Sequence, residues 1–357
     1  MPPYKSLLAP LLFTQDPEKI HHRIALVLER MQSPTGLKWL NRWFGPPSSP
    51  GLHQNIMGLN FSHPIGMAAG FDKDARMYKA LSAMGFSFVE IGTLTPQPQL
   101  GNEKPRLFRL KQDQALINRM GFNNGGVDAA LPRLRSKGHI IVGGNIGKNK
   151  FTPNEKAVDD YLLAFDHLYP FVDYFVLNVS SPNTPGLREL QDKQPLMALI
   201  RAVMHRNASK AISRPILLKI APDLNEHQLW EVAEVILESK LDGVIAGNTT
   251  INRDGLKTPE STINKIGAGG LSGLPLKHRS TMMVQQLRQY LGNEPVIIGV
   301  GGIFNGRDVI EKLIAGADLV QVYTGFVYEG PSMVKNCLQE MLHGLKSGHW
   351  NWSPKNP

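Results

Sequence analysis

Eight short apolar runs recur along most of the chain, and each has glycine or a polar residue at its end or directly beside it. They cover residues 64–69, 86–92, 140–145, 173–178, 215–220, 242–248, 295–299 and 317–323. The intervals between them carry helical patterns, such as 226–240 and 307–315. Alternating strand and helix signals indicate parallel β units, and eight units predict a closed (β/α)8 TIM barrel. An open doubly wound sheet is the main alternative.

Two of the intervals, 93–139 and 249–294, are too long for one helix and its loops. Inserted segments of this size usually carry function. A chain of 357 residues that is 42% hydrophobic can bury a large core, so one main domain with an appendage is expected.

The first 44 residues have a different pattern, which predicts a helical extension. A short apolar helical face comes first, and Asp16, Pro17 and Glu18 then have the order of a helix start. The second helix is strongly amphipathic, and Pro34 and Gly36 are expected to end it. The expected division is a helical extension (1–44), a linker (45–51), a barrel (52–345) and a C-terminal tail (346–357).

The apolar face of this extension has two possible partners. It could pack entirely on the barrel, or part of it could stay open to lipid, since apolar helices with Trp, Lys and Arg at their margins suit a membrane interface. The pattern alone leaves both possibilities open.

Composition excludes several classes of function. The chain has 39 Lys and Arg against 30 Asp and Glu, a net charge of +9, which suits nucleic acid, an anionic membrane or phosphate-bearing ligands. Because dense basic clusters are absent, we expect no nucleic-acid groove. The single cysteine, Cys337, excludes an internal disulfide and fits a reducing compartment. No histidine spacing typical of metal sites occurs, so no metal is expected.

The apolar runs also bear on location. No uninterrupted run reaches the roughly 18 to 20 residues that cross a bilayer. The N-terminus lacks the long apolar stretch and cleavage site of a signal peptide. We therefore expect a protein that is neither exported nor membrane-spanning.

In a barrel, the residues that close the strands meet at one face. The fourth run is followed by Asn178, Ser181, Asn183 and Thr184, whose amides and hydroxyls suit a small oxygen-rich ring and removal of a proton from it. The segment 118–124 adds further amides.

Glycines and one lysine at other strand ends indicate a phosphorylated cofactor. Gly301-Gly302 and Thr324-Gly325 follow the last two runs, where backbone N–H groups and a short helix commonly hold phosphate. Lys219 ends an apolar run, so its ammonium needs an anion. That anion could be a reduced flavin ring or a nearby carboxylate such as Asp223.

Nine ordered motifs between Asp16 and roughly Leu338 resemble those of the quinone-dependent (class 2) dihydroorotate dehydrogenases. These motifs are residues 68–73, 90–93, 104–109, 117–124, 145–149, 178–185, 219–223, 269–273 and 299–302. The resemblance implies a (β/α)8 enzyme that oxidises (S)-dihydroorotate to orotate in de novo pyrimidine (UMP) biosynthesis. It also implies one FMN per chain as the hydride acceptor and a membrane quinone as the final electron acceptor.

The resemblance also implies roles for individual residues. Ser181 is the base that removes the C5 proton, with Thr184 and Phe122 in the catalytic group and a water path as a further relay. FMN contacts fall on Ala69, Gly70, Phe71, Asp72, Lys73, Thr93, Asn145, Asn178, Lys219, Gly247, Gly273, Gly302, Tyr323 and Thr324. Substrate contacts fall on Lys73, Asn118, Arg119, Met120, Gly121, Phe122, Asn178, Asn183, Asn248 and Thr249.

By the same resemblance, the N-terminal extension forms the mouth of a quinone tunnel. His21, Arg109 and Tyr323 match positions that line it. Lipid contact of the extension then becomes the favoured reading. The expected location is peripheral, on the cytoplasmic face of a bacterial inner membrane, since no transit peptide precedes the first helix. The expected state is a monomer.

Three departures from the family pattern and three rival functions remain. Gly247 replaces a usual Thr, Ala75 replaces a common Gly, and the tail 348–357 has no counterpart.

Two of the rival functions need a catalytic cysteine, which this site lacks. They are a soluble fumarate- or NAD-linked dihydroorotate dehydrogenase and a flavin-dependent tRNA dihydrouridine synthase. The third rival is a barrel that only binds a phosphorylated ligand.

Overall fold

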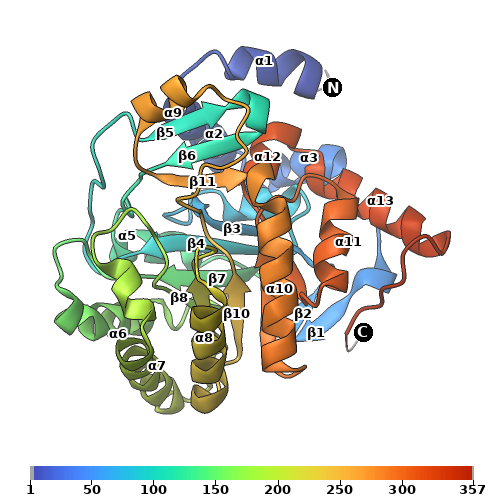
Figure 1. Ribbon diagram of the computed structural model, residues 1–357. Helices are drawn as coiled ribbons and strands as arrows, with labels where there is room; N and C mark the ends of the chain where they lie inside the picture. The colour runs from blue at the N-terminus through green and yellow to red at the C-terminus, as the bar shows by residue number, and fades with distance from the viewer. Residues whose placement is uncertain (1–3, 356–357) are drawn as a thin grey trace.

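The computed structural model describes residues 4–355, and its centre is a closed barrel of eight parallel strands (Figure 1). Around the barrel the order is β10-β12-β13-β3-β4-β7-β8-β9. The strands are β3 (Ile65–Asp72), β4 (Phe88–Leu94), β7 (Ile141–Ile146), β8 (Tyr174–Asn178), β9 (Ile216–Ile220), β10 (Gly243–Ala246), β12 (Val296–Val300) and β13 (Leu319–Val322). Each coincides with one of the eight apolar runs, so the predicted barrel is confirmed and the open sheet is excluded.

Helices follow the strands and cover the outside of the barrel. They are α4 (Tyr78–Ala83), α5 (Val127–Leu134), α6 (Ala157–Leu168), α7 (Lys193–Ala208), α8 (Glu226–Ser239), α10 (Lys277–Leu291), α11 (Gly306–Ile314), α12 (Thr324–Glu329) and α13 (Met333–Lys346). Every residue of β8 and β9 is buried because the barrel interior covers one face and this helical layer covers the other. That double burial explains why the strands are apolar without alternation.

The barrel interior has its own apolar core near the amino ends of the strands. Phe88, Tyr174, Leu217 and Ile298 belong to it. A hairpin formed by β1 (Gln54–Ile56) and β2 (Leu59–Phe61) contributes Phe61 to the same cluster. The amino end is therefore filled, and the carboxyl ends of the strands are left to form the site.

The two long insertions meet in a small antiparallel sheet that the sequence did not reveal. Its strands are β5 (Leu107–Leu110), β6 (Ala115–Asn118) and β11 (Gly270–Gly273), in the order β11-β6-β5. In Figure 1 this sheet and the short helix α9 (Glu260–Ile266) lie on the side of the barrel that also carries α1 and α2. Segments 150 residues apart in sequence thus make one layer beside the strand ends.

The N-terminal extension contains one helix more than expected. After a π-helical turn (Tyr4–Leu8) come α1 (Ala9–Leu12), α2 (Pro17–Arg30) and α3 (Pro34–Phe44). Asp16 caps α2 as predicted, by accepting a hydrogen bond of 2.8 Å from the Lys19 amide. The reading of Pro34 and Gly36 as terminators was wrong. Ser33 caps a new helix with Pro34 in its first turn, where proline needs no N–H partner.

The C-terminal residues after α13 lie against the barrel. Trp350 and Trp352 pack on the main apolar core, and Lys355 forms an ion pair with the buried carboxylate of Asp318.

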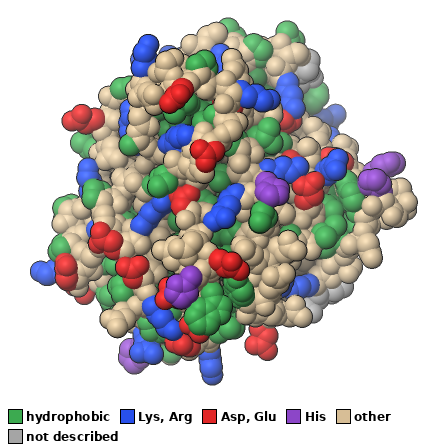
Figure 2. Space-filling view, in the orientation of Figure 1, with side chains coloured by type: hydrophobic (Ala, Val, Ile, Leu, Met, Phe, Trp, Pro, Cys, Tyr) green, Lys and Arg blue, Asp and Glu red, His purple; other side chains and the backbone are tan. Residues whose placement is uncertain are grey.

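On the face shown in Figure 2, positive and negative side chains are interspersed. The described surface there offers no continuous basic stripe.

Candidate active site

A cavity at the carboxyl ends of the strands collects most of the predicted site residues. Among them are Ala69, Gly70, Lys73, Thr93, Asn118, Met120, Gly121, Phe122, Asn178, Ser181, Asn183, Lys219, Gly247, Asn248, Thr249, Gly273, Gly302, Tyr323 and Thr324. They come from both long insertions and from the ends of β3, β4, β8, β9, β10, β12 and β13. Residues spread over 250 positions of sequence therefore share one enclosure, as expected at this end of a TIM barrel.

Ser181 lies in the loop that follows β8 and is only 6% exposed. Its side-chain oxygen accepts a hydrogen bond of 3.2 Å from the backbone N–H of Asn183. Thr184 is buried nearby in sequence but does not line the cavity. Among the described residues, nothing forms a hydrogen bond with the Thr184 hydroxyl.

A buried amide network forms the wall next to Ser181. Asn178 donates from its side chain to the hydroxyl of Thr93 (2.8 Å) and to the side-chain oxygen of Asn145 (3.1 Å). Asn145 donates in turn to Glu90 (2.8 Å). Asn145 does not reach the cavity and instead supports Thr93 and Asn178 from behind.

Lys219 has a carboxylate partner, but it is not the one that the sequence suggested. Its ammonium lies 3.7 Å from Glu90, a residue that is fully buried in β4. Gln321 donates to the other oxygen of Glu90, and its side chain also contacts the buried hydroxyl of Tyr174. The pairing of Lys219 with Asp223 was therefore wrong. Lys219 and Gln321 both line the cavity.

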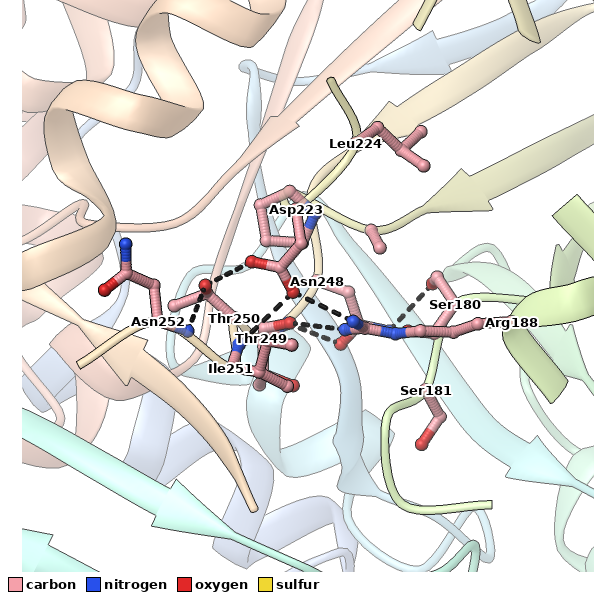
Figure 3. Close-up of polar contacts among 12 residues, drawn as sticks. Ser180, Ser181, Arg188, Asp223, Leu224, Asn248, Thr249, Thr250, Ile251 and Asn252 are labelled. Carbon is pink, nitrogen blue, oxygen red and sulfur yellow. Dashed lines mark hydrogen bonds and ion pairs between the residues drawn. The ribbon is translucent and has the colours of Figure 1, made fainter. Parts of the chain in front are cut away.

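Asp223 instead belongs to a cluster that joins three loops (Figure 3). Arg188 donates to Asp223 (2.9 Å), to the backbone oxygen of Ser180 (3.1 Å) and to that of Thr249 (3.2 Å). Asp223 also accepts from the hydroxyl of Thr250. One guanidinium thus ties the loops after β8, β9 and β10 together next to Ser181.

Lys73 is the charged group at the other side of the cavity. It follows β3 and donates to the side-chain oxygen of Asn123. Burial, reinforced by the positive charge of Arg106, lowers the pKa of Lys73 to about 8. The Lys73 amine is therefore mostly protonated at neutral pH. Because burial removes water from the resulting ammonium, contact with an anionic partner is favourable.

The amides opposite Lys73 also bond to one another. Asn183 donates to Asn118 (3.2 Å), and Asn248 donates to the hydroxyl of Ser180 (2.9 Å). Met120 to Phe122 and Thr249 complete this part of the lining. The cavity therefore offers both donors and acceptors to a polar ring.

Besides Asn145 and Thr184, three further residues predicted to contact FMN or substrate do not line this cavity. Arg119 points away, donating to Ala268 (2.9 Å) and lying over the ring of Phe108. Asp72 accepts hydrogen bonds from the backbone N–H groups of Arg76 and Met77, which form the turn after β3. Burial raises the pKa of Asp72 to about 6. Phe71 lies in the wall of a second cavity.

This second cavity has a volume of about 540 Å³ and is mostly apolar. It lies between the N-terminal helices and the barrel, and its lining includes all three predicted quinone residues, His21, Arg109 and Tyr323. Tyr323 lines both cavities, and burial raises its pKa to about 12. The two cavities therefore share a wall.

The polar groups of the second cavity have few partners. Burial lowers the pKa of His21 to about 4, so the ring is neutral at physiological pH, and its edge meets Phe71 at 5.1 Å between ring centroids. Arg109 donates to the backbone oxygens of Phe13 and Gln15 (both 3.3 Å). Within residues 4–355, nothing forms a hydrogen bond with the Arg109 Nε.

The two internal departures from the family pattern both have a positive φ angle. Gly247 lines it with φ of 117°, a conformation that favours glycine. Ala75 is fully buried with φ of 56°, which explains why glycine is common there.

Sequence reasoning missed the supporting residues Glu90, Arg188 and Gln321. Glu90 had a usable signal, since it is a single carboxylate inside an otherwise apolar strand. Arg188 had none, because its three acceptors come from loops that only the fold brings together.

Across residues 4–355, we find no group of three or more His, Cys, Asp or Glu side chains placed to hold a metal.

Comparison with known proteins gives a consistent result. The family model described as dihydroorotate dehydrogenase matches residues 51–345. Curated relatives named dihydroorotate dehydrogenase (quinone) include those of Christiangramia forsetii, 53% identical over 95% of this chain and 98% of the relative, and of Idiomarina loihiensis, 44% identical over 94% and 99%.

Solved structures agree with this assignment. The structure of DHODH from Eimeria tenella in complex with ferulenol is 39% identical, covers 94% of both chains and has a TM-score of 0.85. The resemblance drawn from the nine motifs is thereby confirmed. The chain belongs to the dihydroorotate dehydrogenase family of oxidoreductases.

Proposed function

We propose that this enzyme oxidises (S)-dihydroorotate to orotate with FMN as hydride acceptor and a membrane quinone as final electron acceptor. This is the redox step of de novo pyrimidine (UMP) biosynthesis. The substrate loses a proton from C5 and a hydride from C6, and the quinone takes up two electrons and two protons. The observation that carries the proposal is the position of Ser181 in a buried polar cavity that shares Tyr323 with an apolar one.

Ser181 is proposed to take the C5 proton. A serine hydroxyl is a weak base at neutral pH, so it needs a setting that moves its own proton onward. The Asn183 N–H donates to its oxygen, which fixes that oxygen and leaves the hydroxyl proton free to be passed on. Thr184, whose buried hydroxyl has spare hydrogen-bonding capacity among the described residues, is the candidate next carrier. Phe122 limits access of water.

Lys73 and the surrounding amides are proposed to hold the substrate. The Lys73 ammonium can form a charge-assisted hydrogen bond with the substrate carboxylate. That contact would compensate for the hydration that the ammonium loses on burial. Asn118, Asn183 and Asn248 present donors and acceptors to the amide edges of the pyrimidine ring. Catalysis then depends on orientation more than on strong acid or base groups.

The residues of the cavity fit FMN, which supplies the two-electron hydride acceptor when it is bound. The Lys219 ammonium, which lines the cavity, can face a ring that gains negative charge. Thr93 and Asn178 would fix one side of the ring system. The backbone at Gly273, Gly302 and Thr324 would hold the phosphate.

The apolar cavity is proposed as the quinone site, and residues 1–44 as its access domain. The neutral His21 places no charge in the apolar cavity, and its ring is held by a hydrogen bond to the backbone of Phe71. The unpartnered Arg109 Nε can donate a hydrogen bond to a carbonyl oxygen of a quinone. The surrounding aliphatic and aromatic side chains suit its ring and tail.

The N-terminal helices also present apolar side chains outward. Leu7, Leu11, Trp39 and Trp43 are between 41% and 64% exposed. No helix in residues 4–355 is long and apolar enough to cross a bilayer. A peripheral monomer that inserts this surface into the cytoplasmic face of a bacterial inner membrane accounts for both observations.

The rival functions have less support. A soluble dihydroorotate dehydrogenase and a tRNA dihydrouridine synthase both need a catalytic cysteine, but the single cysteine of this chain, Cys337, is buried in α13 and does not line the cavity. Burial raises the pKa of its thiol. A reactive thiolate at that position is therefore disfavoured.

One spectroscopic experiment tests the proposal. The purified protein should be yellow, should bleach when dihydroorotate is added without oxygen, and should regain its colour when a quinone is added. A colourless protein would contradict the proposed cofactor. A yellow protein that dihydroorotate does not bleach would contradict the proposed substrate.

A further inference from the structure

The N-terminal helix α2 contains a carboxylate that is almost completely buried against the barrel. Glu18 and Arg106 are 5% and 6% exposed, and they share hydrogen bonds of 2.7 and 3.2 Å. Burial opposes ionisation of Glu18, but the hydrogen bonds and charge of Arg106 outweigh it and keep the pKa of Glu18 below its usual value. Lys104 and His22 lie 3.6 Å from the same carboxylate.

Arg106 uses its remaining N–H groups to hold a loop of the first insertion. Its Nη1 donates to the backbone oxygens of Leu100 (2.6 Å) and Asn102 (2.8 Å). The fit is tight, because a β-carbon on Gly101 would lie 2.9 Å from that same nitrogen. The guanidinium thus helps to fix this loop, together with a backbone hydrogen bond of 3.1 Å from the Asn102 N–H to Met120.

Asn102 connects this loop to the segment that contains Asn183, on the substrate side of the cavity. Its side-chain amide donates to the backbone oxygens of Arg119 (3.0 Å) and Asn183 (3.2 Å). Asn183 in turn donates its backbone N–H to Ser181 and its side chain to Asn118. Glu18, Arg106, Asn102 and Asn183 thus form a continuous chain of polar contacts that ends at the proposed base.

We infer that Glu18 is a positioning residue for the dihydroorotate half of the reaction, acting through Arg106 and Asn102 on the Asn183 segment. The extension proposed to serve the quinone would then also set the geometry of the substrate loop. This inference rests on the proposed function for the role of Ser181. The physical reason is that removal of Glu18 leaves Arg106 buried without its counterion, and the guanidinium must move to find water or another acceptor.

The chain offers a matched control. Glu29 is also on α2 and also pairs with the barrel, through Arg76. That pair is about one-third exposed, and neither partner contacts the 100–102 loop through any described hydrogen bond. Glu29→Ala therefore removes a link between α2 and the barrel without disturbing the chain of contacts to Asn183.

The test compares Glu18→Ala with Glu29→Ala in the full-length FMN-loaded protein. Orotate affinity, measured by titration of the flavin absorbance, should fall at least about tenfold in Glu18→Ala and stay within twofold in Glu29→Ala. Amide hydrogen exchange should become faster in the peptides that contain residues 99–103 and 181–186 in the first variant only. Equal behaviour of the two variants in both measurements would overturn the inference.

Two further variants exclude a general loss of stability. Glu18→Gln keeps the size and one acceptor oxygen, and it decides the question by the same criteria if Glu18→Ala does not fold. Asn102→Ala should reproduce the loss of orotate affinity with α2 intact, and adding Glu18→Ala to it should cause little further loss. Additive effects would show that Glu18 does not act through Asn102.

The outcome is separable from that of the proposed function. If dihydroorotate fails to bleach the unmodified protein, the proposed reaction is wrong. The difference in hydrogen exchange between Glu18→Ala and Glu29→Ala still shows whether Glu18 holds the Asn183 segment through Arg106 and Asn102. If the unmodified protein bleaches normally and the two variants do not differ, only the inference about Glu18 is wrong.

Discussion

The backbone N–H of Asn183 donates a 3.2 Å hydrogen bond to the side-chain oxygen of Ser181. The bond is local in sequence, but Asn183 itself is held by Asn102, which is 81 residues away in the chain. The orientation of the proposed base therefore depends on contacts that only the tertiary structure creates.

Replacement of Ser181 tests its role most directly. Ser181→Ala should keep FMN bound but slow flavin reduction by dihydroorotate by at least about 100-fold, because the proton acceptor is lost. Stopped-flow absorbance measures that rate. Ser180→Ala is the matched control, since that hydroxyl supports Asn248 without lining the cavity, and it should slow reduction far less. A modest rate change in Ser181→Ala would remove Ser181 from its proposed role.

The lowered pKa of Lys73 predicts a pH dependence of substrate affinity. The ammonium is present below its pKa of about 8 and is lost as the pH rises through that value. Because only the charged form attracts the carboxylate, orotate affinity should be constant near neutral pH and fall above pH 8, by up to about tenfold per unit. Titrations of the flavin absorbance between pH 6.5 and 9.5 measure it. In Lys73→Gln, affinity should be weak at every pH, so a retained dependence would assign the titration to another group.

Substitution of Arg109 should separate the two halves of the reaction. Arg109→Leu removes the unpartnered Nε from the apolar cavity, so the KM for quinone should rise at least about tenfold, while flavin reduction by dihydroorotate stays within twofold. Steady-state and single-turnover measurements give the two values. Arg23→Leu changes an exposed arginine of α2 outside the cavity and should affect neither. Equal quinone kinetics in both variants would contradict the proposed quinone site.

The exposed apolar residues of the extension predict membrane binding. Leu11→Ser combined with Trp43→Ser should reduce the fraction of protein that sediments with anionic lipid vesicles several-fold, since each change removes apolar surface from the bilayer interface. Turnover with a water-soluble quinone analogue should change little. Ile212→Ser alters an equally exposed apolar residue on the barrel and serves as the control. Unchanged sedimentation would show that the extension does not bind lipid.

Much of the fold could be predicted because its signals are local. Strands buried on both faces must be continuously apolar, so all eight barrel strands appeared as apolar runs. The error at Pro34 has an equally local cause. Proline ends one helix and can begin the next, and only the Ser33 cap distinguishes the two cases.

The site was predictable in part for a different reason. Residues that follow parallel strands of a barrel meet at one end, so the position of Asn178, Ser181 and Lys219 in sequence implied their proximity. Which groups pair was not implied. Lys219 of β9 meets Glu90 of β4 because both side chains point into the barrel, where they approach each other across the interior although β7 and β8 separate their strands.

The sequence by itself determined the barrel, the helical extension and the residue types at the strand ends, since periodicity and strand termini are properties of short segments. Only the tertiary structure decided that both insertions join in one sheet, that Arg188 ties three loops together, and that Glu18 of the extension pairs with Arg106 of the barrel. Each of these contacts joins segments far apart in the chain. Their geometry follows from how the segments pack and not from any pattern within one of them.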